Sequence, residues 1–292
     1  MTTDLLLEGV HFDLTYVPLQ HLGYKAAIVN FSDIYAMNGQ PKQITLSLGL
    51  SKRFCIEDLE EFYVGLQLAC DLYGVDIVGG DTSMSMTGLT ISITCVGEGE
   101  AGKIVYRSGA QENDLICVSG DLGAAYMGLQ LLEREKNVFH GSTDFQPEFG
   151  GKEYLLERQL KPEARKDIIE ALYQARLTPT AMIDISDGLS SELLHIAKES
   201  AVGCRIFEER IPIDYQTAAM SEEFNMNLVT AALNGGEDYE LLFTVPLGMH
   251  DRVAAIKGIT IIGHITKPEY GNLLVGRDGG EIELIAQGWQ SI

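Results

Sequence analysis

The sequence AMIDISDGL, residues 181–189, joins an apolar strand to a helix through an acidic turn. Its first three residues predict the end of a buried strand, and the apolar spacing from Leu189 onward predicts a helix. The turn contains Asp184, Ser186 and Asp187, so the strand presents two carboxylates and a hydroxyl at the edge of a sheet. Two interpretations are open for such acids: they bind a metal ion, or they cap the helix.

Three further segments place an acid beside a hydroxyl or amide group, next to an apolar segment. They are residues 2–4 (TTD), 30–33 (NFSD) and 79–82 (GGDT). In the last of these, two glycines follow a short strand expected over residues 75–78. They allow a phosphate to approach the backbone, where Asp81 would carry a cation, although a plain tight turn uses the same residues. In residues 235–240 (GGEDYE) the order is reversed, because the acids precede a strand instead of following one. The repeated arrangement favours a metal and phosphate site.

The chain has 292 residues, of which 46% are hydrophobic, and a formal net charge of −21. This length predicts two domains with a large core. The charge argues against nucleic acid or an anionic membrane as a partner, and no apolar run approaches the roughly 20 residues of a membrane span. An anionic substrate would need cations between itself and the protein, usually Mg²⁺. Five scattered cysteines without a CxxC pair predict reduced thiols in a cytoplasmic protein.

Strands and helices mix without strict βαβ alternation, which predicts an α+β fold instead of a doubly wound sheet. Helices are expected over residues 22–37, 57–73, 124–133, 164–175 and 190–200, and strands over 44–50, 75–78, 89–96, 115–118, 204–207, 240–245 and 259–265. The domain junction is expected near residues 106–109, which gives an N-terminal domain of residues 1–106 and a C-terminal domain of residues 107–292. Residues 137–151 have no period and are expected to form a lid or a plain surface loop.

The remaining sequence motifs either give a weaker functional signal or exclude a class of enzyme. Residues 97–102 match GxGxxG, but two glutamates would face a pyrophosphate and a strand follows, so a dinucleotide site is rejected. The sequence has no GxxxxGK[ST], HExxH or GxSxG motif, which excludes P-loop kinases and the commonest zinc proteases and serine hydrolases. Arg107 fits either a phosphate ligand or a surface ion pair. Trp289 fits either a stacking platform or a hydrophobic plug. His11 alone favours a structural role.

The motifs, in their order along the chain, resemble the thiamine-monophosphate kinase family. The segments that carry the resemblance are residues 2–6, 8–12, 29–33, 79–82, 107–110, 183–189 and 235–241, and they span essentially the whole chain. The resemblance implies transfer of phosphate from ATP to thiamine phosphate, giving thiamine diphosphate and ADP, with several Mg²⁺ ions. It also implies a two-domain α+β fold with a mixed N-terminal sheet, a larger C-terminal domain, an active site in the cleft between them, and homodimers formed through the N-terminal domain.

The resemblance also implies roles for individual residues. The magnesium ligands would be Thr2, Thr3, Asp4, Asp33, Asp81, Asp184 and Asp187, with Asp184 and Asp187 also expected to be catalytic. ATP would be contacted by Tyr73, Gly80, Asp81, Arg107 and Ser186, and thiamine phosphate by His11, Glu237 and Trp289. The acceptor phosphate is already largely ionised near neutral pH, because its second pKa is about 6. We therefore expect direct in-line attack on the γ-phosphate, without a phospho-enzyme.

One departure from the family pattern leaves alternatives open. Family members carry a segment before the Thr-Thr-Asp strand whose Gly-Asp-Asp motif also holds magnesium, whereas Met1 stands directly before Thr2 here. Without these ligands, the chain as given is expected to keep its affinity for nucleotide better than it keeps its rate of turnover. The alternatives are another ATP-dependent synthetase of the aminoimidazole-ribonucleotide synthetase-like superfamily, of selenophosphate or purine-pathway type, and a non-catalytic ATP-binding scaffold.

Overall fold

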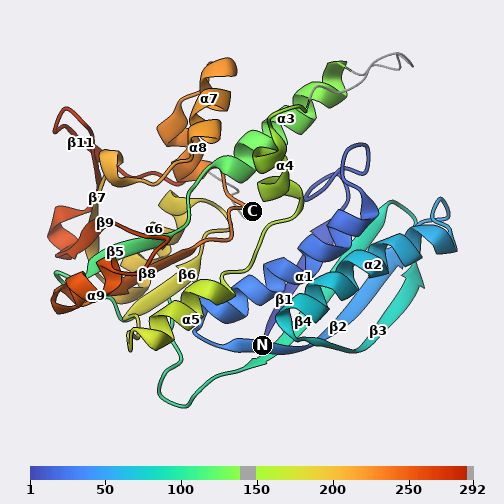
Figure 1. Cartoon of the computed structure of the whole chain (residues 1–292), viewed down its shortest axis with the longest axis horizontal. Coiled ribbons are helices and arrows are strands. Elements are labelled where there is room, and N and C mark those ends of the chain that lie inside the picture. The colour runs from blue at the N-terminus through green and yellow to red at the C-terminus, as the bar shows by residue number, and fades with distance from the viewer. Residues whose placement is uncertain (139–148, 288–292) are drawn as a thin grey trace.

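The computed structural model describes residues 1–138 and 149–287 of the chain. Two β-sheets lie side by side, and each is covered by helices (Figure 1). The long helix α1 (Leu19–Ala36) runs between the two sheets. The α+β class expected from the sequence is confirmed. Among the described helices, none combines the length and the hydropathy needed to cross a bilayer.

The N-terminal sheet has four strands in the order β1-β4-β2-β3. They are β1 (Thr2–Leu7), β2 (Gln40–Leu50), β3 (Asp76–Met84) and β4 (Leu89–Glu98). β2 and β3 run parallel, and the other two pairings are antiparallel, so the sheet is mixed. Alternate apolar residues of β2 and β4, such as Ile44, Leu46 and Ile93, are buried on one face beneath α1 and α2 (Ile56–Tyr73). The period of two in the sequence therefore produces one covered face.

The two helices of this half cross at glycines. A Cβ atom added at Gly65 of α2 would overlap the carbonyl oxygen of Gln20, and one added at Gly23 of α1 would overlap that of Phe62. The backbones therefore approach more closely than any side chain allows. This crossing fixes the position of α1, which also carries Asp33.

The C-terminal sheet has seven strands in the order β11-β10-β7-β9-β5-β8-β6. They are β5 (Leu115–Ser119), β6 (Ala181–Asp184), β7 (Gly203–Phe207), β8 (Leu241–Val245), β9 (Ile259–Thr266), β10 (Asn272–Val275) and β11 (Glu281–Glu283). Along β5, Leu115 and Cys117 join one apolar cluster, whereas Ile116 and Val118 join a second. The centre of this sheet is therefore buried on both faces.

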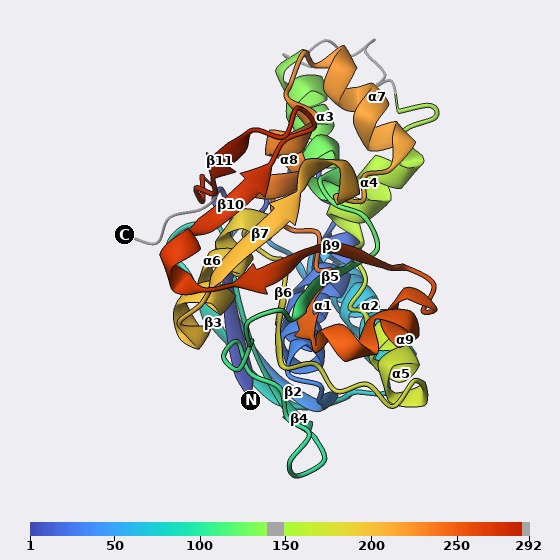
Figure 2. The ribbon, with the colours of Figure 1, turned by 90° about the vertical axis from the view of Figure 1, so that its left-hand side faces the viewer.

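Helices cover both faces and one end of the C-terminal sheet. α5 (Lys166–Gln174) packs in the cluster that also contains α1, and α6 (Leu189–Ser200) packs in the cluster on the opposite face. The helices at one end are α3 (Ala124–Val138), α4 (Glu153–Leu160), α7 (Tyr215–Glu223) and α8 (Leu228–Asn234) (Figure 2). The short α9 (His250–Ala254) lies near α5. Because one cluster joins α1, α2, α5 and the C-terminal sheet, a continuous core holds the two halves together.

Most of the expected elements are present within a few residues. The helix expected over residues 124–133 extends to Val138, and the elements that were not expected are α4, α7, α8, α9, β10 and β11. One expectation is wrong: the strand thought to end before Gly79 continues as β3 to Met84, because residues 79–84 pair with β2. The boundary at residues 106 and 107 stays a prediction. Of the loop at 137–151, residues 139–148 lie outside the described part.

We predict that Gly65→Ala destabilises the protein by about 1–3 kcal/mol, because the added methyl group must push α2 away from Gln20. The measurement is urea unfolding of the variant beside the wild type. Gly248→Ala is the matched control, since a Cβ there meets no atom within 4 Å. Equal stability of the Gly65→Ala variant and the control would show that the helix crossing tolerates a side chain.

Candidate active site between the two sheets

The acidic turn lies where β6 meets α6. Asp184 is the last residue of β6 and is buried, with 3% of its surface exposed. The helix that follows begins after Gly188, which has a φ of 119° and provides no side-chain cap. Neither Asp184 nor Asp187 caps the helix, so the capping interpretation of these acids is wrong. Their carboxylates remain available for other partners.

The turn is held by a second loop and by a buried acid. Backbone hydrogen bonds join it to the loop before β8: the Glu237 N–H donates to the Ser186 carbonyl at 2.7 Å, and the Tyr239 N–H donates to the Ile185 carbonyl at 2.9 Å. Glu237 and Tyr239 have φ values of 58° and 52°, a left-handed conformation that few side chains adopt. Glu192 of α6, which is buried, accepts the Asp187 N–H at 3.0 Å. The two acidic loops are thus shaped as one unit.

The N-terminal half brings its acids to the same place. Ser32 on α1 donates a hydrogen bond of 2.5 Å to the Asp184 carboxylate, which directly links the two halves. The next residue, Asp33, accepts a hydrogen bond from the Thr2 hydroxyl of β1. Asp4, two residues further along β1, has a buried carboxylate oxygen without a hydrogen-bond partner. Three carboxylates from three separate elements therefore meet at the junction of the sheets.

Burial and mutual repulsion raise the pKa values of two of these carboxylates, Asp184 and Asp4. Burial, and then the charge of Asp33, raise the pKa of Asp184 to about 8. The same two causes raise the pKa of Asp4 to about 6. Burial also raises the pKa of Glu192 to about 7. Acids that lie this close together repel one another, and a bound cation would offset that repulsion. The site is therefore suited to bind a cation.

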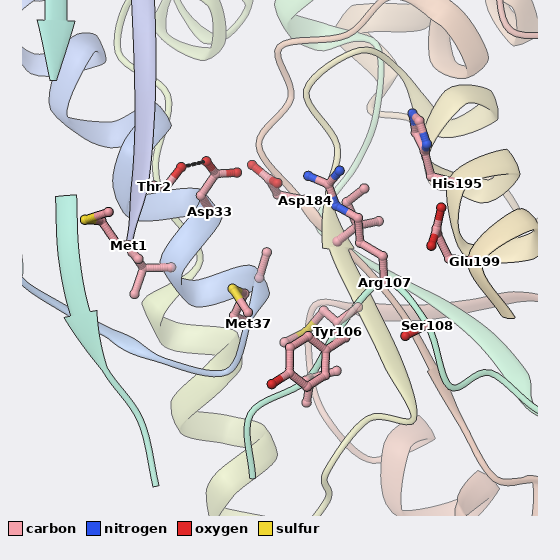
Figure 3. A pocket seen from close by; sticks show the side chains of 15 residues that line it. Met1, Thr2, Asp33, Met37, Tyr106, Arg107, Ser108, Asp184, His195 and Glu199 are labelled. Atoms are coloured by element: carbon pink, nitrogen blue, oxygen red, sulfur yellow. Dashed lines mark hydrogen bonds between the residues drawn. The ribbon is translucent and has the colours of Figure 1, made fainter. Parts of the chain in front are cut away.

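Two cavities open on either side of this acidic cluster. The smaller, of about 490 Å³, is lined by Thr2, Arg107, His195 and other residues. The larger, of about 820 Å³, is lined by His11, Glu237 and other residues. Asp33 and Asp184 line both. Figure 3 shows Thr2 and Asp33 on one side of the smaller cavity and Asp184, Arg107 and His195 on the other. The carboxylate pair therefore forms the wall between two spaces, each large enough for part of a ligand.

Arg107 is exposed at the mouth of the smaller cavity, and it forms no ion pair with any residue that the structure describes. The surface ion pair considered from the sequence is therefore not seen. The charge of Arg107 acts on the nearby acids Asp187 and Glu192 without a contact ion pair, so its N–H donors are suited to bind an anion from solution.

The other predicted residues divide into two groups. Asp4, His11, Ser186, Asp187 and Glu237 line the larger cavity. Thr3, Tyr73, Gly80 and Asp81 line neither cavity. Gly80 and Asp81 are exposed on the edge strand β3, and the Tyr73 hydroxyl donates to the Ala164 carbonyl at 3.0 Å. Trp289 lies outside the described residues.

The acidic cluster suits Mg²⁺ through pairs of carboxylates. Within residues 1–138 and 149–287, no group of three or more acidic, histidine or cysteine side chains is placed to hold a metal ion by itself. Magnesium commonly binds through one or two carboxylates plus substrate phosphates and water, so pairs such as Asp33 and Asp184 suit it. The unpartnered oxygen of Asp4 is a further free ligand.

Sequence reasoning missed two residues of the larger cavity. Lys25 and Gln159 both contact Glu237. For Lys25 a signal was present, because Lys25, Val29 and Asp33 are spaced four apart and so share one face of a helix. Gln159 had no such signal, since α4 itself was not expected.

Known proteins resemble this chain in sequence. A family model described as AIR synthase related protein, N-terminal domain, matches residues 1–98. The thiamine-monophosphate kinase of Aquifex aeolicus is 37% identical over 290 residues, which cover 99% of this chain and 87% of that protein. The chain belongs to the thiamine-monophosphate kinase family. The family member of Bacillus subtilis is 35% identical over 244 residues, which cover 83% of this chain and 70% of that protein.

Solved structures agree with the family assignment. A structure described as AaThiL complexed with AMPPCP and TMP matches with a TM-score of 0.85 at 36% identity, covering 100% of this chain and 86% of that one. Hydrogenase maturation protein HypE in complex with ATP matches with a TM-score of 0.78 at 17% identity, covering 99% and 84%. The second likeness shows the fold alone. Identities of 30–37% link the chain to thiamine-monophosphate kinases across most of its length.

We predict that the stability of metal-free Asp184→Asn relative to the wild type rises between pH 5 and pH 8.5, so that the variant is the more stable protein at pH 8.5. The folded state raises the pKa of Asp184 to about 8, so it binds a proton that the unfolded chain releases near pH 4. The wild type therefore loses stability as pH rises from about 4 through 8, and asparagine has no proton to lose.

The measurement is urea unfolding in EDTA at both pH values. Asp251→Asn is the control, because this side chain is fully exposed on α9. A variant that is less stable than the wild type at pH 8.5 would contradict the view that Asp184 is held against repulsion.

Proposed function

We propose that this protein transfers the γ-phosphate of ATP to thiamine phosphate, giving thiamine diphosphate and ADP. The observation that carries the proposal is the pair of cavities that share Asp33 and Asp184. A kinase whose acceptor is a phosphate must bring two anionic groups together, and this arrangement gives each its own space with a cation site between them. The names of its relatives, and the ATP analogue and TMP in a solved relative, support this choice.

We assign the smaller cavity to the phosphates of ATP and the larger one to thiamine phosphate. Arg107, which lines the smaller cavity, presents a planar fork of N–H donors that matches phosphate oxygens. His11 and Glu237, which line the larger cavity, offer a ring and a carboxylate to the acceptor. Ser186 and Asp187 lie on the turn near the shared wall, within reach of the phosphates.

Asp33 and Asp184, together with substrate phosphates and water, would hold Mg²⁺, which would supply charge neutralisation between the two phosphate groups. The chain's own residues align the reactants, because Ser32 and Thr2 fix the orientation of the two central carboxylates. No strong base is required, since the acceptor phosphate is largely ionised near neutral pH. We infer direct in-line attack at the junction of the two halves, and the separate cavities on either side of Asp33 and Asp184 support it.

The edge strand β3 supports a homodimer through the N-terminal domain. Val78 and Met84 on β3 and Met86 just beyond it are exposed, at 53%, 72% and 95%. Gly80 and Asp81 lie on the same strand, away from the acids of their own chain. A second copy that covers this edge would place Asp81 at an interface, where it can complete the nucleotide site of the neighbouring subunit. We place the protein in the cytoplasm, a location supported by its five free cysteines, four of which are buried.

The first test is product formation. Protein incubated with ATP, Mg²⁺ and thiamine phosphate is expected to form thiamine diphosphate and ADP in equal amounts, as measured by chromatography. Removing Mg²⁺ with EDTA should lower the rate by about 100-fold or more, because the two phosphates then repel each other. ADP release without thiamine phosphate, or no diphosphate at all, would reject the assignment.

The second test separates the two cavities. Arg107→Met should raise the KM for ATP by about tenfold and leave that for thiamine phosphate nearly unchanged, because this side chain lines only the smaller cavity. His11→Ala should show the reverse pattern. Steady-state kinetics with each substrate varied in turn measures both. If either variant affected both KM values equally, the two cavities would not be separate substrate sites.

The third test concerns Asp81. Asp81→Asn and Asp184→Asn should each be nearly inactive alone, but refolding them together should recover about a quarter of wild-type activity. Half of the dimers are then hybrids, and each hybrid has one site with both aspartates intact. Refolding each variant alone is the control. Activity that stays at the level of the single variants would show that Asp81 does not act across an interface.

A further inference from the structure

Lys25 is a buried cation in the wall of the larger cavity. Only 7% of its surface is exposed, and it lies on α1, most of whose residues are buried. Its ammonium group lies 3.1 Å from a carboxylate oxygen of Glu237 and donates to the Gln159 carbonyl at 3.0 Å. Gln159 in turn donates its side-chain amide to the other oxygen of Glu237 at 2.8 Å. A buried charge is stable only when it is paired in this way.

This pair joins the two halves of the molecule. Lys25 belongs to α1, whereas Glu237 belongs to the loop before β8. Without a cation beside it, the Glu237 carboxylate would face a cavity that Asp33, Asp184 and Asp187 also line. Like charges would then favour its turning away from the cavity. Lys25 therefore fixes the position of the Glu237 carboxylate.

The same helix sets the distance between the two ends of the cavity. Leu22, Lys25, Val29 and Asp33 line it from one face of α1. Eight residues separate Lys25 from Asp33, which corresponds to about 12 Å along the helix axis. Asp33 marks the end where the phosphates meet, so the end at Lys25 receives the part of the acceptor farthest from its phosphate. In thiamine phosphate this part is the aminopyrimidine ring.

We propose that Lys25 is a specificity-determining residue, which holds the Glu237 carboxylate in place to accept a hydrogen bond from the exocyclic amine of the acceptor's aminopyrimidine ring. The carboxylate has about four lone-pair sites, so its bonds to Lys25 and Gln159 leave room for the ring. A site built around a fixed polar group strongly disfavours ligands that leave the group unpaired. This inference rests on the proposed kinase activity and adds the means by which the acceptor is chosen.

The experiment compares two acceptors: thiamine phosphate, and the thiazole phosphate that lacks the aminopyrimidine ring. The wild type is expected to prefer the first, as measured by the ratio of their kcat/KM values. Lys25→Met should lower this ratio by about tenfold or more, with the KM for ATP unchanged. A merely structural role would lower both kcat/KM values together and leave the ratio as it was, which would overturn the proposal.

Two further variants keep the test decisive. Lys103→Met removes a lysine that pairs with Glu100 outside both cavities, and it should leave the ratio unchanged. If Lys25→Met fails to fold, Glu237→Gln keeps the shape of the side chain but removes the charge that Lys25 holds. A lowered ratio in Glu237→Gln supports the proposal, and an unchanged ratio overturns it. A wild type without activity on thiamine phosphate would instead refute the proposed function itself.

Discussion

The repulsion among the carboxylates of Asp4, Asp33 and Asp184 is the constraint on which the rest of the structure depends. These groups come from β1, α1 and the end of β6, so they meet only because two separate sheets pack against one helix. Burial makes the repulsion costly and raises the pKa of Asp184 to about 8. A fold that maximised its own stability would place apolar residues here. The proposed function accounts for these acids, because a cation and two phosphates would offset their repulsion.

Helix α1 carries residues that line both cavities. It is buried along most of its length, and its glycine crossing with α2 and its contacts with the C-terminal sheet hold it rigidly. From that fixed position it presents Ser32 to Asp184, Asp33 to both cavities and Lys25 to Glu237. Precise placement of catalytic groups needs such a rigid support. One helix thereby fixes the wall that the two cavities share and the Lys25 end of the larger cavity.

The sequence predicted the fold class and the acidic turn, because both depend on local patterns. Apolar alternation marked β2 and β4, and the AMIDISDGL stretch marked the junction of β6 and α6. Prediction from the sequence failed where the structure depends on contacts between segments that are distant in the chain. Gly79 and Gly80 looked like the end of a strand, but pairing with β2 carries β3 through them. Lys25 was overlooked because its partners, Glu237 and Gln159, are more than a hundred residues away and only the folded chain brings them to it.

The central claim is that the two phosphates meet at Asp33 and Asp184. Crystals grown with Mn²⁺, a non-hydrolysable ATP analogue and thiamine phosphate test it directly, because the anomalous signal of manganese distinguishes the cation from water and lighter ions. The account predicts a manganese peak within coordination distance of both carboxylates, with nucleotide phosphates on the Arg107 side and the acceptor phosphate on the His11 side. A peak bound elsewhere, or both phosphates in a single cavity, would contradict it.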